Sequence, residues 1–458
     1  MEYTLPFIIG LFVILSIYFS PNAKTATTFY SGFSPSGQAP GLVTLVFSQV
    51  TTWIFARSLM NAAVLGYFYG IWGTLAYSVY YLSFLTGGII IDRLRFDMGY
   101  TSIQTFLQDR FGKTGTVCYN FLIIIRLISE VFANLLVIGL IFGVAGSTSY
   151  ITAIILFSIG VLSYSMLGGL HASLKTDVLQ MGIFIFVLLL LLLSILESQQ
   201  FTFSDLHFVE FELGNPGPIL MLVAFLQIWS YPVHDPVMMD RGFLSNREIT
   251  RKSFLHAAWI SIICIVAFGS LGVLAGAHAF EGETMNDVLT RTLGEWPMIL
   301  FSTTLIISAM STLDSTLSSS SKLIAVDMKL LSVNVRNGRM IMSIFMLLGL
   351  LLIFSGNQDL FSAVAVSGTA SLFLAPVVFF CIFAKRIDVP SWSLLLSFVA
   401  AITGAVLYFT ESSGYTDWLG NSHKYTKLLQ ITVAVLIAGC LMFWMGIKTS
   451  QAKYQSDT

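Results

Sequence analysis

Long apolar segments constrain this chain more than any other feature of its sequence. Runs of about 20 predominantly apolar residues, the length that spans the hydrocarbon core of a bilayer, recur throughout the chain. Because the 458 residues are 56% hydrophobic and 10% charged, we expect an all-α polytopic membrane protein with about 13 transmembrane helices. The segments lie near residues 4–19, 41–69, 71–91, 115–144, 149–167, 173–196, 217–238, 253–277, 296–325, 336–355, 358–383, 391–410 and 426–446.

The charged residues lie mostly in the connections between these segments. With an external N-terminus, most Lys and Arg residues, Arg241 among them, fall in cytoplasmic loops, and only Arg291, Lys424 and Lys427 fall outside. The positive-inside rule therefore predicts an integral plasma (inner) membrane protein with its N-terminus outside and its C-terminus in the cytoplasm. The N-terminus lacks the basic region and cleavage site of a signal peptide, so segment 4–19 is expected to be a retained helix.

The chain shows no pattern of catalytic or metal-binding residues. No HExxH, GxSxG or phosphate-binding glycine loop is present, and the six histidines do not cluster at metal spacing. Cys118, Cys264, Cys381 and Cys440 are widely separated, as is typical of inert core thiols. A net charge of -1 gives no reason to expect nucleic-acid binding. We therefore expect neither an enzyme nor a bound cofactor.

A serine-rich stretch lies inside the apolar segment 296–325. At about 100° per residue, five of its hydroxyl side chains fall on one face of a helix. These residues are Ser308, Ser311, Thr312, Ser315 and Ser319. A hard cation such as sodium prefers oxygen ligands, which a row of hydroxyls and a few freed carbonyls can supply. Serines also let helices approach closely, so the stripe alone leaves a sodium site and helix packing equally open.

One apolar segment is predicted to be broken. The stretch from Gln227 to Pro236 contains two prolines and the pair His234–Asp235. Proline removes a backbone donor, and irregular backbone at membrane depth is tolerated only where it is buried in protein or lines a cavity. If the chain has two halves of five helices, this break opens the second half and segment 41–69 opens the first. Paired interrupted helices point to a transport site, although segment 41–69 has no mid-helix proline.

Charges inside the apolar segments need a physical reason, because a charge at the bilayer centre costs roughly 2.5–3.5 kcal/mol on insertion scales. For Arg57, contact with a solute competes with a salt bridge to Asp235 or another carboxylate. Arg126 and Glu130 are four residues apart on one helix and can neutralise each other. The alternative for Arg126 is a two-pronged contact with a solute carboxylate.

Three further charged residues are predicted near the inner ends of helices. Asp177 stands at the cytoplasmic start of segment 173–196, where the helix dipole favours a carboxylate. Asp314 and Lys322 share the serine-rich helix, and Lys322 lies near its inner end. We expect Lys322 to extend its ammonium group to the membrane interface.

Four stretches together resemble the sodium/solute symporter family, whose members include sodium-coupled glucose, proline and sialic acid carriers. Residues 307–327 resemble the family's helix with Met-Ser-Thr and a serine run, and residues 168–180 resemble its Gly-Gly-x-x-Ala to Thr-Asp-x-x-Gln stretch. Residues 240–245 with Arg251 are similar to its Gln-Arg signature, with aspartate in the glutamine place. Residues 360–376 match its tenth core helix.

The resemblance implies one transporter domain over residues 1–458, with an APC-type core of two inverted five-helix repeats that works by alternating access. It places an extra helix at 4–19, repeat A at about 41–196, repeat B at about 217–383 and C-terminal helices at about 391–446. It also implies a sodium ion near the midplane. The implied ligands are the carbonyls of Thr51, Ile54 and Ser308 and the hydroxyls of Ser311 and Thr312.

Some family members bind a second sodium ion farther inward. The resemblance places the corresponding ligands here at Asp177, Ser311, Asp314 and Ser315. Asp314 departs from the pattern, because the family usually has a hydroxyl or small residue at this position.

The resemblance also points to solute-binding residues. Arg126 resembles the arginine that binds the substrate carboxylate in sialic acid carriers, and Phe55 and Ser58 match solute-lining positions. The complete predicted set is Phe55, Arg57, Ser58, Arg126, His234 and Asp235. The family's usual glycines after the helix bend are replaced here by Met-Asn-Ala-Ala, so the identity of the solute cannot be borrowed from sugar or proline carriers.

We therefore expect a secondary active transporter that uses the sodium gradient to import a small polar organic solute. Arg57 and Arg126 favour an anionic solute, a carboxylate or a sialic-acid-like molecule. Sodium is the expected coupling ion, and the expected partners are sodium, the solute and the lipid bilayer, without nucleic acid. Two alternatives stay open: a proton-coupled carrier of a neutral or zwitterionic solute that uses Asp177, and a solute sensor without its own output domain.

Overall fold

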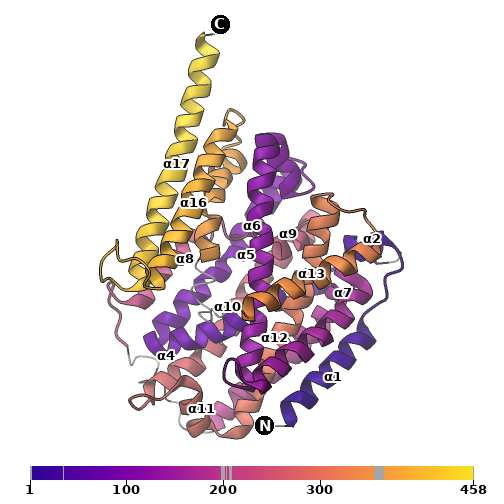
Figure 1. Ribbon diagram of the computed structural model, residues 1–458, viewed down its shortest axis with the longest axis vertical. Coiled ribbons are helices and arrows are strands. Elements are labelled where there is room, and N and C mark those ends of the chain that lie inside the picture. The colour runs from indigo at the N-terminus through magenta and orange to yellow at the C-terminus, as the bar shows by residue number, and fades with distance from the viewer. Residues whose placement is uncertain are drawn as a thin grey trace.

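Helices make up all the regular secondary structure of the described residues. The computed structural model describes residues 3–34, 36–197, 202, 204–205, 209–354 and 366–456. The helices pack side by side in one bundle, with α1 at the side near the N-terminus and α17 projecting at the opposite end (Figure 1).

The predicted helical segments all fall on observed helices. The first half contains α1 (Thr4–Phe19), α2 (Ala26–Ser31), α3 (Leu42–Trp53), α4 (Ala56–Val79), α5 (Ser83–Ile91), α6 (Ile103–Phe142) and α7 (Thr148–Glu197). The remainder contains α8 (Pro216–Gln227), α9 (Pro236–Gly242), α10 (Arg247–Ala277), α11 (Met285–Leu293), α12 (Glu295–Lys322), α13 (Val335–Phe354), α15 (Leu374–Pro376) within the helical span Val366–Phe383, α16 (Ser391–Ser412) and α17 (Lys424–Ser456). The first part of the predicted segment 358–383, including residues 360–365, lies outside the described residues.

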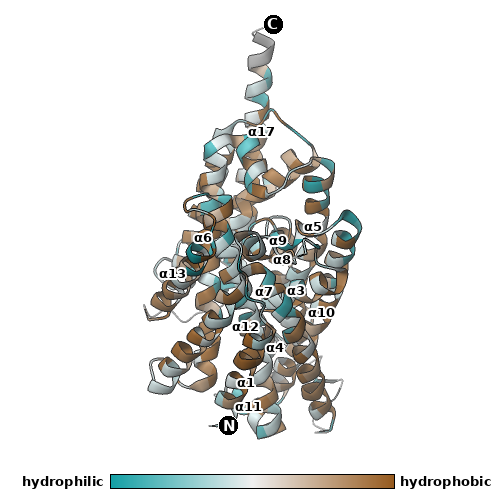
Figure 2. Ribbon diagram, turned by 90° about the vertical axis from the view of Figure 1, so that its right-hand side faces the viewer, coloured by the Kyte–Doolittle hydropathy of each residue, from teal (hydrophilic) through white to brown (hydrophobic). Residues whose placement is uncertain are grey.

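The protein is an integral membrane protein, as predicted. Among the described residues, nine helices are long and apolar enough to cross a membrane, and α1, α3 and α8 are shorter apolar helices. Hydrophobic residues line most of the helices (Figure 2), and large apolar side chains such as Leu189 and Leu193 remain exposed. Apolar surface of this extent is stable in contact with lipid rather than water.

The serine-rich helix α12 lies at the centre of the bundle. Of its most apolar stretch, 89% is buried, against 33% for α17. All residues from Leu300 to Ser321 are buried, so the hydroxyl groups of this helix face other helices and not lipid. Buried polar groups are costly unless they are hydrogen-bonded, which means that the neighbouring helices must supply partners or a ligand must do so.

Two membrane segments are interrupted. The predicted break after α8 is confirmed: residues 228–235 are not helical, and α9 begins only at Pro236. The segment 41–69 is interrupted as well, because α3 ends at Trp53 and α4 begins at Ala56. This second break has no proline, and side chains hold its free backbone groups. Tyr81 donates to the Trp53 carbonyl at 2.9 Å, and the Ala56 N–H donates to Oδ1 of Asn134 at 3.2 Å.

Other helix boundaries differ from the prediction. The segments 149–167 and 173–196 join in α7 through a kink at Gly169, which has a φ of 57°. A Cβ there would lie 2.4 Å from the Phe29 carbonyl oxygen, so only glycine allows this turn. α6 starts at Ile103 rather than near 115, and the short helices α2 and α11 were not predicted. They are too short to show an apolar run of membrane-spanning length.

Candidate functional site

The break between α3 and α4 faces the middle of α12. The Ser308 hydroxyl donates to the Ile54 carbonyl, which is freed from helical hydrogen bonding at the end of α3. The hydroxyl of Thr312, a predicted sodium ligand, has no hydrogen-bond partner among the described residues. The Thr51 hydroxyl has none either, although the prediction assigned the carbonyl of this residue to sodium. Ser311 uses its hydroxyl hydrogen to donate to Oδ1 of Asp177 at 2.7 Å, which leaves its oxygen lone pairs free.

This arrangement fits a small hard cation. Orphaned hydroxyl oxygens inside a membrane protein cost free energy that a bound cation would recover. The Ile54 carbonyl at the end of α3 and the Ser308 hydroxyl of α12 meet here. The oxygen-rich face of α12 therefore contacts the α3–α4 break at Ile54 and Ser308, two of the residues predicted to bind sodium.

Farther along α12, a second cluster surrounds Asp177. This residue lies within α7 and is fully buried, so the prediction of an interfacial helix-terminal carboxylate is wrong. Asp177 follows the kink of α7 at Gly169 and lies inside the bundle. Its Oδ2 accepts from the Ser48 hydroxyl at 2.6 Å and lies 3.4 Å from Nη2 of Arg241.

The other two residues of the predicted second sodium site also join this cluster. Oδ2 of Asp314 accepts from Thr176 at 2.7 Å, while Oδ1 has no hydrogen-bond partner in the described part of the chain. The Ser315 hydroxyl lies 2.9 Å from that of Ser173 and accepts from Arg241 at 2.8 Å. The predicted residues are thus brought together, but around a guanidinium group.

Arg241 was predicted among the cytoplasmic loop charges and is instead fully buried. It follows the break after α8, and α9 carries it back into the bundle towards α7 and α12. Charge counting along the sequence treats every arginine after an apolar segment as a loop residue, so it could not find this position. The available signals were an arginine directly after a broken helix and its place in residues 240–245, which resemble the family's Gln-Arg signature.

On the other side of the α3–α4 break, Arg126 is held by two carboxylates. Its Nη2 donates to Oδ2 of Asp235 at 2.9 Å, and its Nη1 lies 3.1 Å from Oε2 of Glu130. All three side chains are fully buried. The ion pair between Arg126 and Glu130, predicted as the alternative to solute binding, is therefore present. Asp235 is a second partner, which sequence spacing could not reveal.

Arg57 lies nearby and has no such partner. It is 1% exposed, and none of the described carboxylates forms an ion pair with it. Its Nε and Nη1 have no hydrogen-bond partner among the described residues, and its guanidinium lies 5.0 Å from the centre of the Phe55 ring. Arg126 lies 5.4 Å from the same ring. The proposed alternative of a salt bridge between Arg57 and Asp235 is wrong, because Asp235 pairs with Arg126.

The other predicted solute residues make internal hydrogen bonds. Nδ1 of His234 lies 2.7 Å from the Tyr231 carbonyl, and its Nε2 lies 3.2 Å from the Ser367 hydroxyl. Asp235 caps α9, since its Oδ1 accepts from the Met238 N–H at 2.9 Å. The Ser58 hydroxyl accepts from Tyr77 at 3.1 Å. Among the described residues, Nε and Nη1 have no hydrogen-bond partner in either Arg57 or Arg126, but only Arg126 is in ion-pair contact with carboxylates.

At the inner end of α12, Lys322 forms ion pairs with Asp240 and Asp327. The side chain is 20% exposed, and these two carboxylates hold its ammonium group. Asp240 also accepts from Ser319 at 2.7 Å, whereas Ser320 and Ser321 donate to carbonyls of α12 itself.

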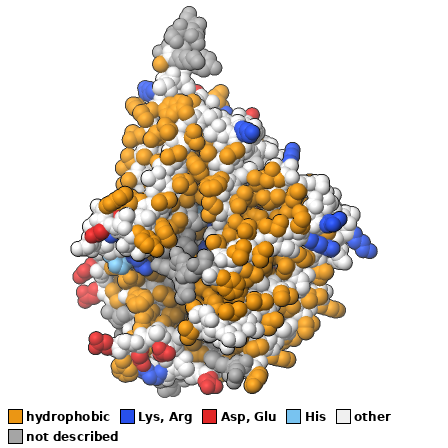
Figure 3. All heavy atoms as spheres, viewed as in Figure 1, with side chains coloured by type: hydrophobic (Ala, Val, Ile, Leu, Met, Phe, Trp, Pro, Cys, Tyr) orange, Lys and Arg blue, Asp and Glu red, His pale blue; other side chains and the backbone are white. Residues whose placement is uncertain are grey.

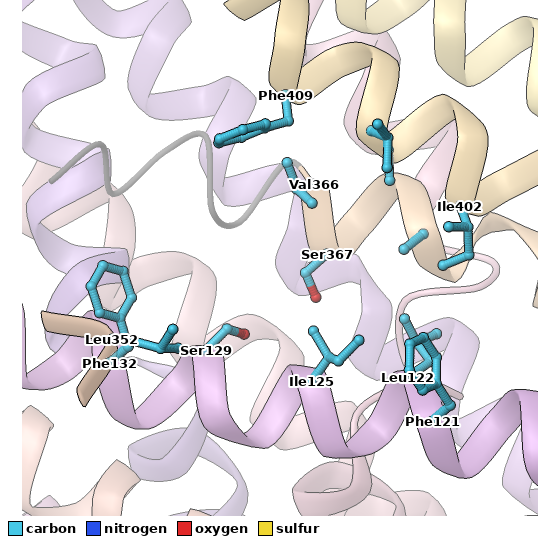
Figure 4. Close-up of a pocket in the computed structure, with 13 residues that line it drawn as sticks. Phe121, Leu122, Ile125, Ser129, Phe132, Leu352, Val366, Ser367, Ile402 and Phe409 are labelled. Atoms are coloured by element: carbon cyan, nitrogen blue, oxygen red, sulfur yellow. The ribbon is translucent and has the colours of Figure 1, made fainter. Parts of the chain in front are cut away.

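A cavity of about 420 Å³ lies beside the Arg126 cluster, between α6, α16 and the helical span Val366–Phe383. Its lining is almost entirely apolar and includes Phe121, Ile125 and Phe409 (Figure 4). Ser367 lines this cavity and also contacts His234. None of the residues that line this apolar cavity belongs to the predicted sodium or solute sites.

Comparison with known proteins places these clusters in a family context. Residues 36–209 match the sodium:solute symporter family, so the resemblance predicted from the sequence is confirmed over this part of the chain. The match supports a sodium-coupled symporter. A comparison with curated proteins finds no match.

Solved structures confirm the predicted architecture. One similar structure is that of a sodium-coupled sialic acid symporter in a substrate-bound outward-open state. The alignment covers 97% of the present chain and 98% of that symporter, with a TM-score of 0.70 and 15% identity. The present chain covers 95% of Mhp1, a nucleobase-cation-symport-1 family transporter, over 94% of its length with a TM-score of 0.58 and 12% identity. It covers 94% of a manganese transporter of Eremococcus coleocola over 90% of its own length, with a TM-score of 0.52 and 14% identity. The fold and the matched family are those of membrane transporters, in agreement with the prediction of a protein that is not an enzyme.

Proposed function

We propose that this protein is a sodium-coupled symporter that imports a small organic solute carrying a carboxylate group. The observation that carries the proposal is the α3–α4 break. Ile54 on one side of it reaches the oxygen-rich face of α12, and Arg57 on the other side is a buried cation without a counter-ion among the described residues. The proposed sodium site at Ile54 and the proposed carboxylate site at Arg57 thus lie on the two sides of the same helix break.

The sodium ion is proposed to bind the carbonyls of Thr51, Ile54 and Ser308 and the hydroxyls of Ser311 and Thr312. Support comes from the Thr312 hydroxyl, which has no hydrogen-bond partner among the described residues. The Ser308 hydroxyl donates to the Ile54 carbonyl, so the end of α3 and the middle of α12 are in contact. Sodium would take this carbonyl as a ligand and so tie α3 to α12 more strongly than one hydrogen bond does.

The solute carboxylate is proposed to bind Arg57. Among the described residues, the buried charges near Phe55 are the guanidinium groups of Arg57 and Arg126 and the carboxylates of Glu130 and Asp235. Both carboxylates are in contact with Arg126, so Arg57 is the group left to attract an anion. A guanidinium group matches a carboxylate with two parallel hydrogen bonds, and Nε and Nη1 of Arg57 are free to form them.

Sodium and solute are coupled through the break that they share. Sodium at Ile54 orders the end of α3, and this ordering fixes the start of α4, where Arg57 lies. Each ligand then raises the affinity for the other, by a coupling free energy that is typically about 1–3 kcal/mol. Such coupling lets the inward sodium gradient drive the solute across the membrane by alternating access.

The proposed orientation has the N-terminus outside and the C-terminus in the cytoplasm. Most Lys and Arg side chains in Figure 3 lie towards the end where α17 projects, and most Asp and Glu side chains lie towards the opposite end. The positive-inside rule assigns the basic end to the cytoplasm.

The proposal is tested by uptake into proteoliposomes with an inward sodium gradient, using a panel of monocarboxylates, sugar acids, amino acids and neutral sugars. We expect carboxylate uptake with sodium and little uptake with choline in its place. Equal uptake in sodium and choline would refute sodium coupling. Uptake driven by a pH gradient without sodium would favour the proton-coupled alternative.

A further inference from the structure

The buried charges beside the α3–α4 break are divided unevenly between two places. Arg126, Glu130 and Asp235, to which we refer as the Arg126 cluster, combine one positive and two negative formal charges and so carry a net charge of -1. Arg57 carries one positive charge and forms an ion pair with none of the described carboxylates. The guanidinium groups of Arg57 and Arg126 lie 5.0 and 5.4 Å from the centre of the same ring, that of Phe55. A negative and a positive place therefore adjoin one aromatic ring.

Hydrogen bonds through Asn134 hold these two places together. The Asn134 side chain donates to the Glu130 carbonyl at 2.9 Å and accepts from the Ala56 N–H at 3.2 Å. Ala56 is the first residue of α4, and Arg57 follows it directly. The turn of α6 that carries Glu130 is thereby fixed against the turn of α4 that carries Arg57.

Glu130 has oxygen atoms to offer to a ligand. Its Oε2 lies 3.1 Å from Nη1 of Arg126, but neither carboxylate oxygen has a hydrogen-bond partner among the described residues, although the side chain is fully buried. Both oxygens of Asp235 do accept hydrogen bonds, from the Met238 N–H at 2.9 Å and from Nη2 of Arg126 at 2.9 Å. A buried carboxylate without donors is costly, and donors that a ligand brings would recover this free energy.

We propose that the transported solute is a zwitterion, which places its carboxylate on Arg57 and a protonated amine on Glu130. The inference rests on the proposed function, since it concerns the solute of that same symporter, and it narrows the solute from any carboxylate to amino acids and related ammonium carboxylates. An ammonium group has three N–H donors for the unpartnered oxygens of Glu130. The guanidinium of Arg57 matches the carboxylate with two parallel hydrogen bonds.

Charge complementarity separates a zwitterion from a simple anion. A monocarboxylate would neutralise Arg57 but leave the net charge of the Arg126 cluster without compensation, and its own charge would be repelled by Glu130 at short range. A zwitterion brings one charge of each sign to two places of opposite sign. The occupied site is then neutral, as a buried cluster of charges requires.

The proposed sodium ion has a counter-charge of its own, so it does not change this balance. Its proposed ligand Ser311 donates to Asp177 at 2.7 Å. Asp177, Asp314 and Arg241 are all fully buried and combine two negative formal charges and one positive, which leaves -1 beside the sodium site. The charge of the sodium ion is thus matched from α7 and α12, independently of the solute.

The test compares solutes of one carbon skeleton in sodium-driven uptake by the full-length protein in proteoliposomes. Each set contains an L-amino acid, its N-acetyl derivative and the carboxylic acid that lacks the amine, for example phenylalanine, N-acetylphenylalanine and 3-phenylpropionate. The ratio of amino acid uptake to uptake of the acid without the amine is defined as the amine preference. Over a panel of the common amino acids, we expect at least one set with an amine preference of about tenfold or more, because hydrogen bonds to a charged group are worth about 1.5–3 kcal/mol.

Variants of Glu130 connect this preference to the proposed subsite. Glu130→Gln retains the shape of the side chain and removes its charge, so the amine preference should fall by about tenfold or more. Glu130→Asp retains the charge and should keep a preference for the amino acid. Glu411→Gln is the matched control: Glu411 is also a buried glutamate in an ion pair, with Lys427 at 2.8 Å, but it lies on α16. Its amine preference should equal that of the unmodified protein.

Two results overturn the inference and leave sodium-coupled carboxylate import intact. One is sodium-driven uptake of the acids without an amine that equals or exceeds uptake of the amino acids in every set, and the other is an unchanged amine preference in Glu130→Gln. If Glu130→Gln does not fold, the three solutes of each set decide with the unmodified protein alone, since only the amino acid should be transported. Uptake that is the same in sodium and in choline would instead refute the proposed symport function.

Discussion

Arg57 and Arg241 are both fully enclosed in the membrane-spanning bundle, yet their surroundings are opposite. Every guanidinium nitrogen of Arg241 donates a hydrogen bond, and Asp177 supplies its counter-charge. Two nitrogens of Arg57 have no hydrogen-bond partner among the described residues, and its guanidinium lies 5.0 Å from the centre of the uncharged Phe55 ring. Because an unpaired buried charge is costly, the first environment suits a structural ion, and the second agrees with the proposal that Arg57 binds a ligand.

Loss of the carboxylate partner of Arg241 should give the largest effect. Asp177→Ala leaves a buried guanidinium without its ion-pair partner, which typically costs about 3–5 kcal/mol of stability. We expect a strong decrease in the thermal unfolding temperature of the purified protein. Asp314→Asn is the matched control, because Asp314 forms no ion pair with any described residue and should cost much less. Equal losses for both variants would remove the distinction between paired and unpaired carboxylates.

Substitution of Arg57 should impair transport while the fold is retained. Arg57→Ala removes the anchor of the solute carboxylate, and a charge-assisted contact of this kind is worth about 2–5 kcal/mol, so we expect KM to rise on the order of 100-fold. Arg57→Lys should recover part of the loss. Arg126→Ala should instead lower the yield of folded protein, because it leaves Glu130 and Asp235 buried together. Unchanged uptake by Arg57→Ala would remove Arg57 from the solute site.

Substitution of a proposed sodium ligand should have a smaller effect on transport than substitution of Arg57. Thr312→Ala removes one hydroxyl ligand and should lower sodium affinity by about 1.4 kcal/mol, or roughly tenfold, in the sodium dependence of uptake. Ser311→Ala should act in the same direction. Ser320→Ala is the control on the same helix, since Ser320 donates to the Leu317 carbonyl of α12, and its sodium affinity should be unchanged. A similar decrease in Ser320→Ala would indicate a general packing effect.

The smallest effect is expected from an exposed ion pair at the end of the bundle opposite α17. Arg291 donates to Glu283 at 2.8 Å and holds the pKa of this carboxyl below its usual 4.5. A lowered folded-state pKa stabilises the protein above the unfolded-state pKa, and this contribution disappears as the pH falls below about 4.5. Glu283→Gln should therefore leave the unfolding temperature at pH 7 nearly unchanged and reduce its dependence on pH below 4.5. A large decrease at pH 7 would show that exposed pairs also hold this fold together.

The row of hydroxyl groups on α12 could be predicted from periodicity alone, whereas the proposed sodium ligands follow from the family resemblance. The stripe on α12 is a property of helix geometry, and four of its members contact different partners: Ile54, Asp177, Arg241 and Asp240. The prolines between Gln227 and Pro236 likewise predicted the break after α8. The α3–α4 break was not visible in the same way. It depends on Tyr81 and Asn134, which belong to other segments of the chain.

The sequence by itself determined that this chain spans a membrane many times, where most of its helices lie, and which helix carries a row of oxygen ligands. Length, hydrophobicity and the helical period are local properties and suffice for these conclusions. Only the tertiary structure decided which buried charges are paired. The partner of Arg126 in α9 lies 109 residues away, and the partners of Arg241 in α3, α7 and α12 lie 64 to 193 positions from it. Pairing at such separations depends on how helices pack, which no local pattern records.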